Sequence, residues 1–245
     1  MKIGLSSFIR PLTVADFLEK YENNIPVALH NQKNDLKPLF ELPLLSSLET
    51  LLENWPKTVQ AHLPDLRDES SAIEVNAQDA RKLFANGMGL LFNEVHTHQT
   101  ILQTYLETLR LDLGLSRLAY GRCLVYATPA GKGTAPHFDQ NINFVLQIHG
   151  VKTWYLAPNQ HLQNPLTRHT MGSEPDSEML SYLEQPLPQK MPADVETVVL
   201  KPGSFLFVPR GYWHSTVAQS DALALNFTFT PPTWIDIFTT ALKSR

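Results

Sequence analysis

The sequence contains a single cysteine, Cys123, among its 245 residues. One cysteine cannot form an intramolecular disulfide, so the fold must be stabilised by its core alone, which fits a reducing cytoplasmic compartment. Long apolar runs are also missing. Ser6, Arg10 and Pro11 interrupt the N-terminal segment, and no stretch approaches the ~20 apolar residues that span a bilayer. We therefore expect a soluble, cytoplasmic protein with neither a signal peptide nor a membrane partner.

A strong charge of either sign is also absent. Lys and Arg together number 20 and Asp and Glu 24, which gives a formal net charge of −4. Without a global basic field, nucleic acid is not an expected partner. The hydrophobic share of 43% and the charged share of 18% are typical of ordinary globular proteins and not of disordered or fibrous chains. We expect one domain covering residues 1–245.

Residues 1–115 carry mainly helical patterns. The strongest helix start is Thr13, because Asp16 follows three residues later and an apolar face comes after it. Similar patterns predict helices after Ser46, after Asn76 with a cap at Gly87, and over residues 101–113, together with one strand at 25–30. This part is therefore interpreted as a mainly helical lead-in.

From about residue 122 the pattern changes to short β-branched and aromatic runs separated by Gly, Pro, Asn or Asp. Many short strands of this kind predict an all-β core, here a double-stranded β-helix or jelly roll over residues 116–231. A C-terminal helix over 232–245, capped by Thr233, is expected to pack on this barrel. Residues 159–194 are rich in proline and lack periodicity, which is typical of a lid or binding loop.

Two sequence frames supply side chains that can bind a metal. Gly131 is followed after five residues by His137 and Asp139, and an H-x-D pair on an extended chain directs both side chains to one face. Gly203 opens a second frame, G-x5-P-x-G-x2-H, which ends at His214. Each fragment alone is common without a metal. Together, two imidazoles and one carboxylate form the facial triad that leaves coordination positions of Fe(II) open.

The order and spacing of the two frames resemble the two motifs of the cupins. More specifically, HFDQNINFVLQIHGVKTWYLAP, at residues 137–158, resembles the H-x-D-x3-N-F-x2-Q-x2-G-x-K-x-W-x-L-x-P run of the JmjC-type branch. This branch contains Fe(II)- and 2-oxoglutarate-dependent oxygenases, among them the ribosomal-protein histidyl hydroxylases and the asparaginyl hydroxylase that inhibits hypoxia-inducible factor. The resemblance covers residues 122–231 and, more weakly, the N-terminal part. It implies Fe(II), 2-oxoglutarate and O2, with His137, Asp139 and His214 as catalytic metal ligands.

The same resemblance implies residues that bind the cosubstrate. Lys152 matches the lysine that pairs with the C5 carboxylate of 2-oxoglutarate, and Thr134 matches a hydroxyl donor to the same group. Asn143 and Asn226 match amides that line the cosubstrate pocket, and Tyr126 is expected to line it as well. A solvated strand lysine is the alternative interpretation of Lys152, and a buried structural amide is that of Asn226.

The chain departs from other cupins in ways that narrow its function. Asp139 stands where many cupins have histidine, and Asn143 replaces the glutamate of the four-ligand cupins, which argues against His3Glu isomerases and decarboxylases. The resemblance predicts a hydroxylase of a protein side chain, a peptide or a small metabolite. N-demethylation by the same chemistry and a non-catalytic metal-binding cupin are the alternatives. A metal-dependent cupin isomerase or dioxygenase that does not use 2-oxoglutarate is a third.

Other features of the sequence do not decide the substrate, the oligomeric state or which further residues lie next to the site. We expect the helical dimerisation and winged-helix region of the ribosomal oxygenases to be absent, so their ribosomal substrate and dimer interface do not transfer. A homodimer through the C-terminal helix is still an option. Trp154 and Trp213 fit either the site or the core. Arg168 and Arg210 could reach an acidic substrate, although an ordinary solvated arginine is the favoured interpretation.

Overall fold

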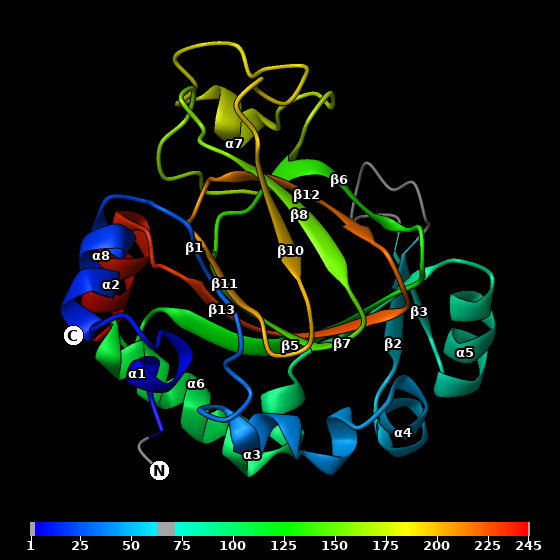
Figure 1. Ribbon diagram of the computed structural model, residues 1–245. Helices are drawn as coiled ribbons and strands as arrows, with labels where there is room; N and C mark the ends of the chain where they lie inside the picture. Colours follow the sequence, from blue (N-terminus) through cyan, green and yellow to red (C-terminus); the bar gives the residue numbers. More distant parts are fainter. Residues whose placement is uncertain (1–2, 63–71, 245) are drawn as a thin grey trace.

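Two β-sheets face each other at the centre of the protein, as the computed structural model of residues 3–62 and 72–244 shows (Figure 1). The larger sheet has the strand order β1-β11-β7-β13-β5-β4-β2-β3 and the smaller sheet the order β10-β8-β12-β6-β9. The barrel is built from β5 (Tyr120–Thr128), β6 (Gly133–Phe138), β7 (Ile142–His149), β8 (Lys152–Ala157), β10 (Glu196–Leu200), β11 (Phe205–Val208), β12 (Trp213–Ala218) and β13 (Ala222–Thr230). Because these strands are divided between two facing sheets, the predicted double-stranded β-helix is confirmed.

The strand β13 shows how the sequence divides one strand between the core and a cavity. Leu225 and Phe227 belong to the hydrophobic core beneath the larger sheet. Asn226 and Thr228 alternate with them and line a cavity between the sheets. Successive side chains of a strand point to opposite faces, so one run of alternating residues serves both surfaces. Both faces of β13 are therefore buried.

Helices of the first part of the chain cover the larger sheet. They are α1 (Leu5–Phe8), α2 (Val14–Glu22), α3 (Lys37–Phe40), η1 (Pro43–Leu45), α4 (Leu48–Asn54), α5 (Ala77–Ala85), η3 (Val95–His98) and α6 (Thr100–Asp112). The backbone N–H groups of Thr13 and Asp16 each donate to the other's side chain, so the predicted capping box is confirmed. The helix predicted after Ser46 begins one residue later, because the Ser47 hydroxyl accepts the capping hydrogen bond of α4.

The first part also contributes strands, most of which the sequence patterns missed. β1 (Val27–Leu29) confirms the strand expected at 25–30 and pairs with β11. β2 (Val59–His62), β3 (Ile73–Val75) and β4 (Gly89–Phe92) extend the larger sheet beyond β5. Runs of three or four residues carry too little alternation to be distinguished from loops, and pairing with a neighbouring strand decides their structure. The lead-in is thus a mixture of helices and strands.

Aromatic side chains concentrate where the N-terminal helices meet the larger sheet, and Phe144 lies at the centre of this cluster. It is fully buried and its ring centroid lies 5.3 Å from that of Phe207 and 6.0 Å from that of Phe17 on α2. Replacing Phe144 by alanine should lower the free energy of unfolding by about 3–5 kcal/mol, because a large cavity would remain. Chemical denaturation measures this loss. The control change Leu111→Ala, at a residue of α6 that is 61% exposed, should cost no more than about 0.5 kcal/mol.

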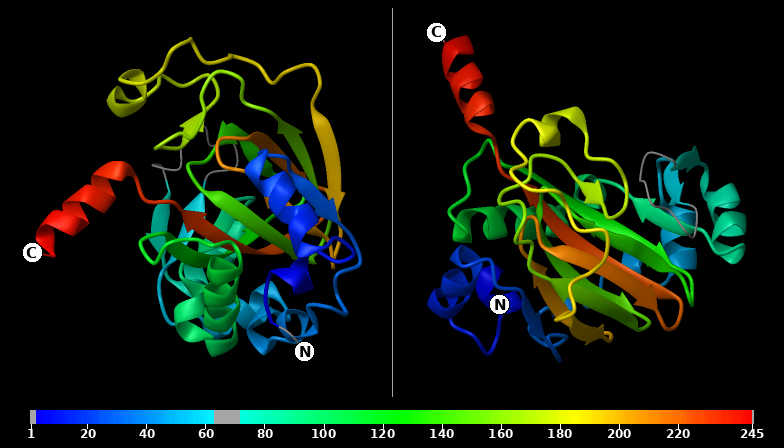
Figure 2. Two further views of the ribbon diagram at one scale, coloured as in Figure 1. Left: turned by 90° about the vertical axis from the view of Figure 1, so that its left-hand side faces the viewer. Right: turned by 90° about the horizontal axis from the view of Figure 1, so that it is seen from above.

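The C-terminal helix is present but does not pack as expected. α8 (Trp234–Lys243) begins with the predicted Thr233 cap. None of its residues is buried, and Trp234 and Ile235 are 74% and 76% exposed. Figure 2 shows it projecting away from the barrel. A cap and an apolar spacing fix where a helix starts and which side chains share a face, but not what covers that face. Neither α8 nor any other helix in the described part of the chain has the length and apolar character that crossing a bilayer requires.

Residues 159–194 form a folded cover over the smaller sheet, drawn in yellow-green at the top of Figure 1. They contain β9 (His169–Thr170), which pairs with β6, and α7 (Ser177–Leu180). Their apolar side chains bury Phe138 and Trp213 in a small separate core with Leu162 and Met179. Trp213 therefore belongs to the core and not to the site.

Candidate metal centre

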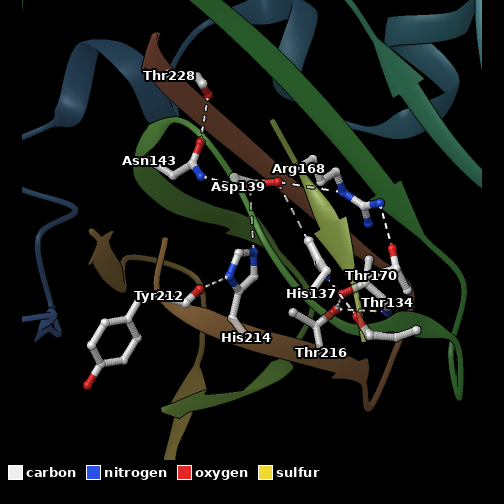
Figure 3. A network of polar contacts seen from close by, with 11 residues as sticks. Thr134, His137, Asp139, Asn143, Arg168, Thr170, Tyr212, His214, Thr216 and Thr228 are labelled. Carbon is white, nitrogen blue, oxygen red and sulfur yellow. Dashed lines mark hydrogen bonds and ion pairs between the residues drawn. The ribbon is translucent and has the colours of Figure 1, made fainter. Parts of the chain in front are cut away.

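Three side chains with metal-binding atoms meet between the two sheets (Figure 3). His137 and His214 are direct partners on the paired strands β6 and β12, and Asp139 follows the end of β6. The ligand atoms of the three residues all lie within 4.8 Å of one another. Asp139 Oδ2 is 3.6 Å from His214 Nε2, and Asp139 Oδ1 is 4.0 Å from His137 Nε2. The structure thus brings together the two imidazoles and the carboxylate that the sequence frames predict.

The H-x-D pair lies at the end of a strand. β6 ends at Phe138, and Asp139 lies in the turn that leads to β7. The backbone N–H of Gly211 donates to the Asp139 carbonyl at 2.9 Å. This bond ties the turn of the first frame to the P-x-G turn of the second. The two sequence frames therefore reach one place because both of their turns lie at the same end of the β6–β12 pair.

Backbone carbonyls fix the orientation of both imidazoles. His137 Nδ1 lies 2.7 Å from the carbonyl of Ala135, and His214 Nδ1 lies 2.9 Å from that of Tyr212. A carbonyl only accepts, so each Nδ1 carries the proton and each Nε2 presents its lone pair. Burial holds the pKa of His137 well below its ordinary range and lowers the pKa of His214 as well. Both rings are therefore neutral and suited to bind a metal ion.

Arg168, from the cover segment, lies beside the carboxylate of the triad. Its Nε is 3.6 Å from Asp139 Oδ1, and its Nη1 donates to the Thr170 hydroxyl at 2.8 Å. Burial by itself raises the pKa of Asp139, but the nearby imidazoles and the guanidinium outweigh it and hold this pKa below its ordinary value. Because the imidazoles are neutral near pH 7, Arg168 is the cation that favours the ionised carboxylate there. The interpretation of Arg168 as an ordinary solvated side chain is wrong, since only 18% of it is exposed.

A second hydrogen-bond chain orients Asp139 from the larger sheet. Asn143 Nδ2 donates to Asp139 Oδ2 at 3.1 Å, and the Thr228 hydroxyl donates to Asn143 Oδ1 at 2.9 Å. The Asp139 carboxylate only accepts, so it faces the Asn143 amide nitrogen, and the Thr228 hydroxyl holds the amide in this orientation by donating to its oxygen. Figure 3 shows the three residues in line. Side chains of this kind tune a metal site without touching the metal.

Replacing Thr228 by valine should weaken metal binding about tenfold, because the Asn143 amide would lose the partner that sets its orientation. Isothermal titration of the chain with Co(II) measures the change. Thr230→Val is the matched control, since Thr230 lies on the same strand and donates to Asn141 instead. Equal losses in the two variants would contradict the role of Thr228.

The triad opens into a cavity of about 120 Å³ between the sheets. All the residues predicted to bind the cosubstrate line it: Tyr126, Thr134, Asn143, Lys152 and Asn226. Arg122, Trp154 and Thr216 line it as well. One cavity therefore collects side chains from both sheets.

Several polar groups in the cavity have no partner among the described residues and fit a bound carboxylate or amide. Lys152 is buried, and its burial lowers the pKa of the ammonium to about 8. Asn226 Oδ1 and Trp154 Nε1 are buried without a hydrogen-bond partner in the described chain. A buried cation and unpaired polar atoms cost free energy unless a ligand pairs with them. The solvated interpretation of Lys152 is therefore wrong. Its ammonium and the Trp154 N–H are donors that suit an anionic ligand, whereas Asn226 Oδ1 can only accept from a donor.

Thr134 lies where the strands β6 and β12 approach each other closely. A side chain at Gly133 would collide with the Thr216 carbonyl, to which its added Cβ would lie only 1.7 Å away. Glycine at this position lets β6 lie tightly against β12, where the hydroxyls of Thr134 and Thr216 are 3.0 Å apart. The sequence interpretation missed Thr216 as a residue of the site. Thr216 follows His214 by two residues, so on an extended strand both side chains point to the same face, and this spacing could have predicted it.

Comparison with known proteins identifies the family. The family model for the JmjC domain matches residues 98–237. The chain belongs to the JmjC domain family. An uncharacterised protein of Bacillus subtilis, YxbC, is 30% identical over 247 residues, which cover 98% of this chain and 75% of that protein. The recognition of a JmjC-type cupin from the sequence is confirmed.

Relatives of the JmjC chain with described activities are longer proteins. The bifunctional lysine-specific demethylase and histidyl-hydroxylase NO66 of Drosophila persimilis is 34% identical over 131 residues, 51% of this chain and 17% of that protein. The crystal structure of the Escherichia coli ribosomal oxygenase YcfD superposes with a TM-score of 0.58 at 18% identity, covering 93% of this chain and 54% of that one. A YcfD structure in complex with cobalt and 2-oxoglutarate gives a TM-score of 0.53. The chain thus spans about half the length of these solved structures, and the likeness to them shows the shared fold.

Proposed function

We propose that this JmjC protein is an Fe(II)- and 2-oxoglutarate-dependent oxygenase that acts as a hydroxylase. One observation carries the proposal: two neutral imidazoles and a carboxylate, with ligand atoms within 4.8 Å of one another, open into the cavity that contains the buried Lys152 ammonium. A His2Asp donor set suits Fe(II) and leaves coordination positions open. A metal site and an anion site in one cavity are what an oxidative decarboxylation of a keto acid requires.

In this proposal each predicted residue has a defined task. His137, Asp139 and His214 hold Fe(II), which when bound supplies the oxidising chemistry: dioxygen and 2-oxoglutarate yield succinate and CO2 as a substrate C–H is hydroxylated. Lys152 pairs its ammonium with the far carboxylate of the cosubstrate. Further polar contacts to the cosubstrate come from the other predicted residues: Thr134, Asn143, Asn226 and Tyr126. The position of the cavity between the two sheets limits the access of water to the site.

Turnover of 2-oxoglutarate by the full chain tests the proposal. The chain loaded with Fe(II) should release succinate from 2-oxoglutarate in the presence of O2, and the chain loaded with Co(II) should bind 2-oxoglutarate in calorimetry. Absence of both signals would argue for a metal-binding cupin without catalysis.

The substrate is proposed to be a side chain of a protein or peptide, or a small metabolite. The names of the NO66 relatives and of YcfD refer to lysine, histidine and the ribosome, which supports a protein substrate. The long cover segment, residues 159–194, lies over the smaller sheet and contributes Arg168 to the cavity. Cover segments of this size commonly act in substrate binding.

A homodimer through α8 is a further part of the proposal. Trp234, Phe238 and Leu242 are 62–76% exposed on this projecting helix. Exposed apolar side chains of this size mark contact surfaces, and two-fold pairing of identical helices buries them at low cost. Sedimentation velocity should show a dimer that the double change Trp234→Ser and Phe238→Ser converts to a monomer. A wild-type chain that stays monomeric at high concentration would contradict the pairing.

A further inference from the structure

Arg122 lies in the wall of the cavity close to the metal centre. On β5 it shares one strand face with Leu124 and Tyr126, and all three line the cavity. Arg122 is the register partner of Thr228, which reaches Asp139 through Asn143. The backbone of Arg122 therefore lies beside the strand position from which Thr228 and Asn143 reach Asp139, and its side chain lines the same cavity as the triad.

The charge of Arg122 is not neutralised within the described part of the chain. Its Nε is buried without an acceptor, and no described carboxylate forms an ion pair with its guanidinium. Its recorded contact is with the ring of Tyr120, whose centroid lies 5.9 Å from the guanidinium carbon. The Tyr120 hydroxyl in turn donates to Glu94 at 3.0 Å, which holds the ring in place. Arg122 is partly buried, and a guanidinium whose buried Nε lacks an acceptor is stabilised when an anion binds to it.

Lys152 and Arg122 are separate anion sites. Lys152 is the register partner of Ala218, four residues along β12 from His214, or about 13 Å at strand spacing. Arg122 instead pairs in register with Thr228, which is connected to Asp139 through Asn143. On the proposed function, the carboxylate of the cosubstrate occupies Lys152, and Arg122 is left for a different anion.

We propose that Arg122 receives a carboxylate of the substrate, so that this oxygenase acts on an acidic molecule; the inference rests on the proposed function. Among the described residues that line the cavity, Asp139 is the single carboxylate, and the metal uses it. A lysine, N-methyllysine or arginine side chain would meet Arg122 and Arg168 with no described acid to pair with. The cavity therefore selects against cationic substrates, which separates this chain from the lysine demethylation in the NO66 names and favours hydroxylation.

Binding of charged probes to the loaded protein tests this selection. The full chain is first loaded with Co(II) and saturated with 2-oxoglutarate, and this step alone tests the proposed function. Three capped tripeptides are then titrated by calorimetry and by the visible spectrum of Co(II). They are acetyl-Ala-Glu-Ala-amide and the two peptides in which Gln or Lys replaces the central Glu. N-acetylalanine and its amide form the small-molecule pair. A preference confined to the peptides indicates an acidic peptide as substrate, and one confined to N-acetylalanine indicates a small acid.

The anionic probe should bind at least about tenfold more tightly than its neutral or cationic counterpart, as expected for a charge-assisted hydrogen bond. Arg122→Gln should abolish this preference, and Arg122→Glu should reverse it in favour of the Lys peptide. Arg81→Gln removes the same charge at an exposed arginine of α5 and should leave the preference intact. Thermal unfolding of each variant checks that the fold is retained. Any of three results would overturn the inference, even where 2-oxoglutarate binds normally. They are equal affinity for all probes, no binding of either anionic probe, and an unchanged preference for the anionic probe in Arg122→Gln.

Discussion

Replacing His137 by alanine is expected to abolish metal binding and, with it, the turnover of 2-oxoglutarate. His137 supplies one of three ligand atoms, and its Nε2 is directed into the site because Nδ1 is bound to the Ala135 carbonyl. Changes to side chains that only support a ligand already cost roughly 10–100-fold in affinity or activity, so loss of a ligand should exceed 100-fold. Co(II) titration and succinate release measure the two effects separately.

His149→Ala is the matched control for this experiment. His149 is an exposed imidazole at the end of β7, and its Nε2 contacts the Leu45 carbonyl and not the cavity. The His149→Ala protein should bind Co(II) and turn over 2-oxoglutarate like the wild type. A His137→Ala protein that retained full Co(II) affinity while folded would disprove the assignment of the triad.

The affinity for 2-oxoglutarate is expected to fall as the pH rises above about 8. Burial lowers the pKa of Lys152 from its ordinary value of 10.5 to about 8. Below that pH the side chain is an ammonium that can pair with a carboxylate, and above it the neutral amine cannot. Binding linked to one proton weakens about tenfold per pH unit beyond the pKa of the free site. Calorimetric titration of the Co(II)-loaded chain between pH 6.5 and about 9.5 measures the profile.

Lys152→Met separates this effect from other titrations. Methionine keeps the length and apolar packing of the stem but removes the charge. The variant should bind 2-oxoglutarate roughly 10–100-fold more weakly at pH 7, as for loss of a charge-assisted pair, and its affinity should not change near pH 8. If the pH dependence persists unchanged in Lys152→Met, another group is responsible for it.

The parts of the site that the sequence predicted are those carried by short, local spacing. His137 and Asp139 are two residues apart, and the frame that ends at His214 contains its own turn, so each fragment fixes its local geometry. Lys152 lies in the run of residues 137–158 that resembles the family. The two metal-binding fragments depend on strand alternation and turn chemistry, both of which can be read within about ten residues, whereas Lys152 was predicted from the resemblance.

Other residues could not be identified in this way because their environment comes from distant segments. Arg168 looks like any surface arginine in a proline-rich stretch, and only the pairing of β9 with β6 carries it to Asp139. Thr228 acts through Asn143, 85 residues away along the chain. The partial burial of Arg122 follows from the pairing of β5 with β13 in the wall of the cavity. Charge and burial of this kind are properties of the assembled barrel.

The sequence by itself determined the helix caps at Thr13 and Thr233, because each depends on interactions between near neighbours in the chain. The jelly-roll class followed from the run of short strand patterns, and the candidate metal-binding triad from two local motifs that resemble a known family. The tertiary structure decided which groups share the cavity, that Trp213 is core, and that α8 projects from the barrel with its apolar face exposed. It also placed Arg168 beside Asp139 and Arg122 in the wall of the same cavity. Those outcomes depend on long-range strand pairing and on the desolvation it imposes, which no local pattern encodes.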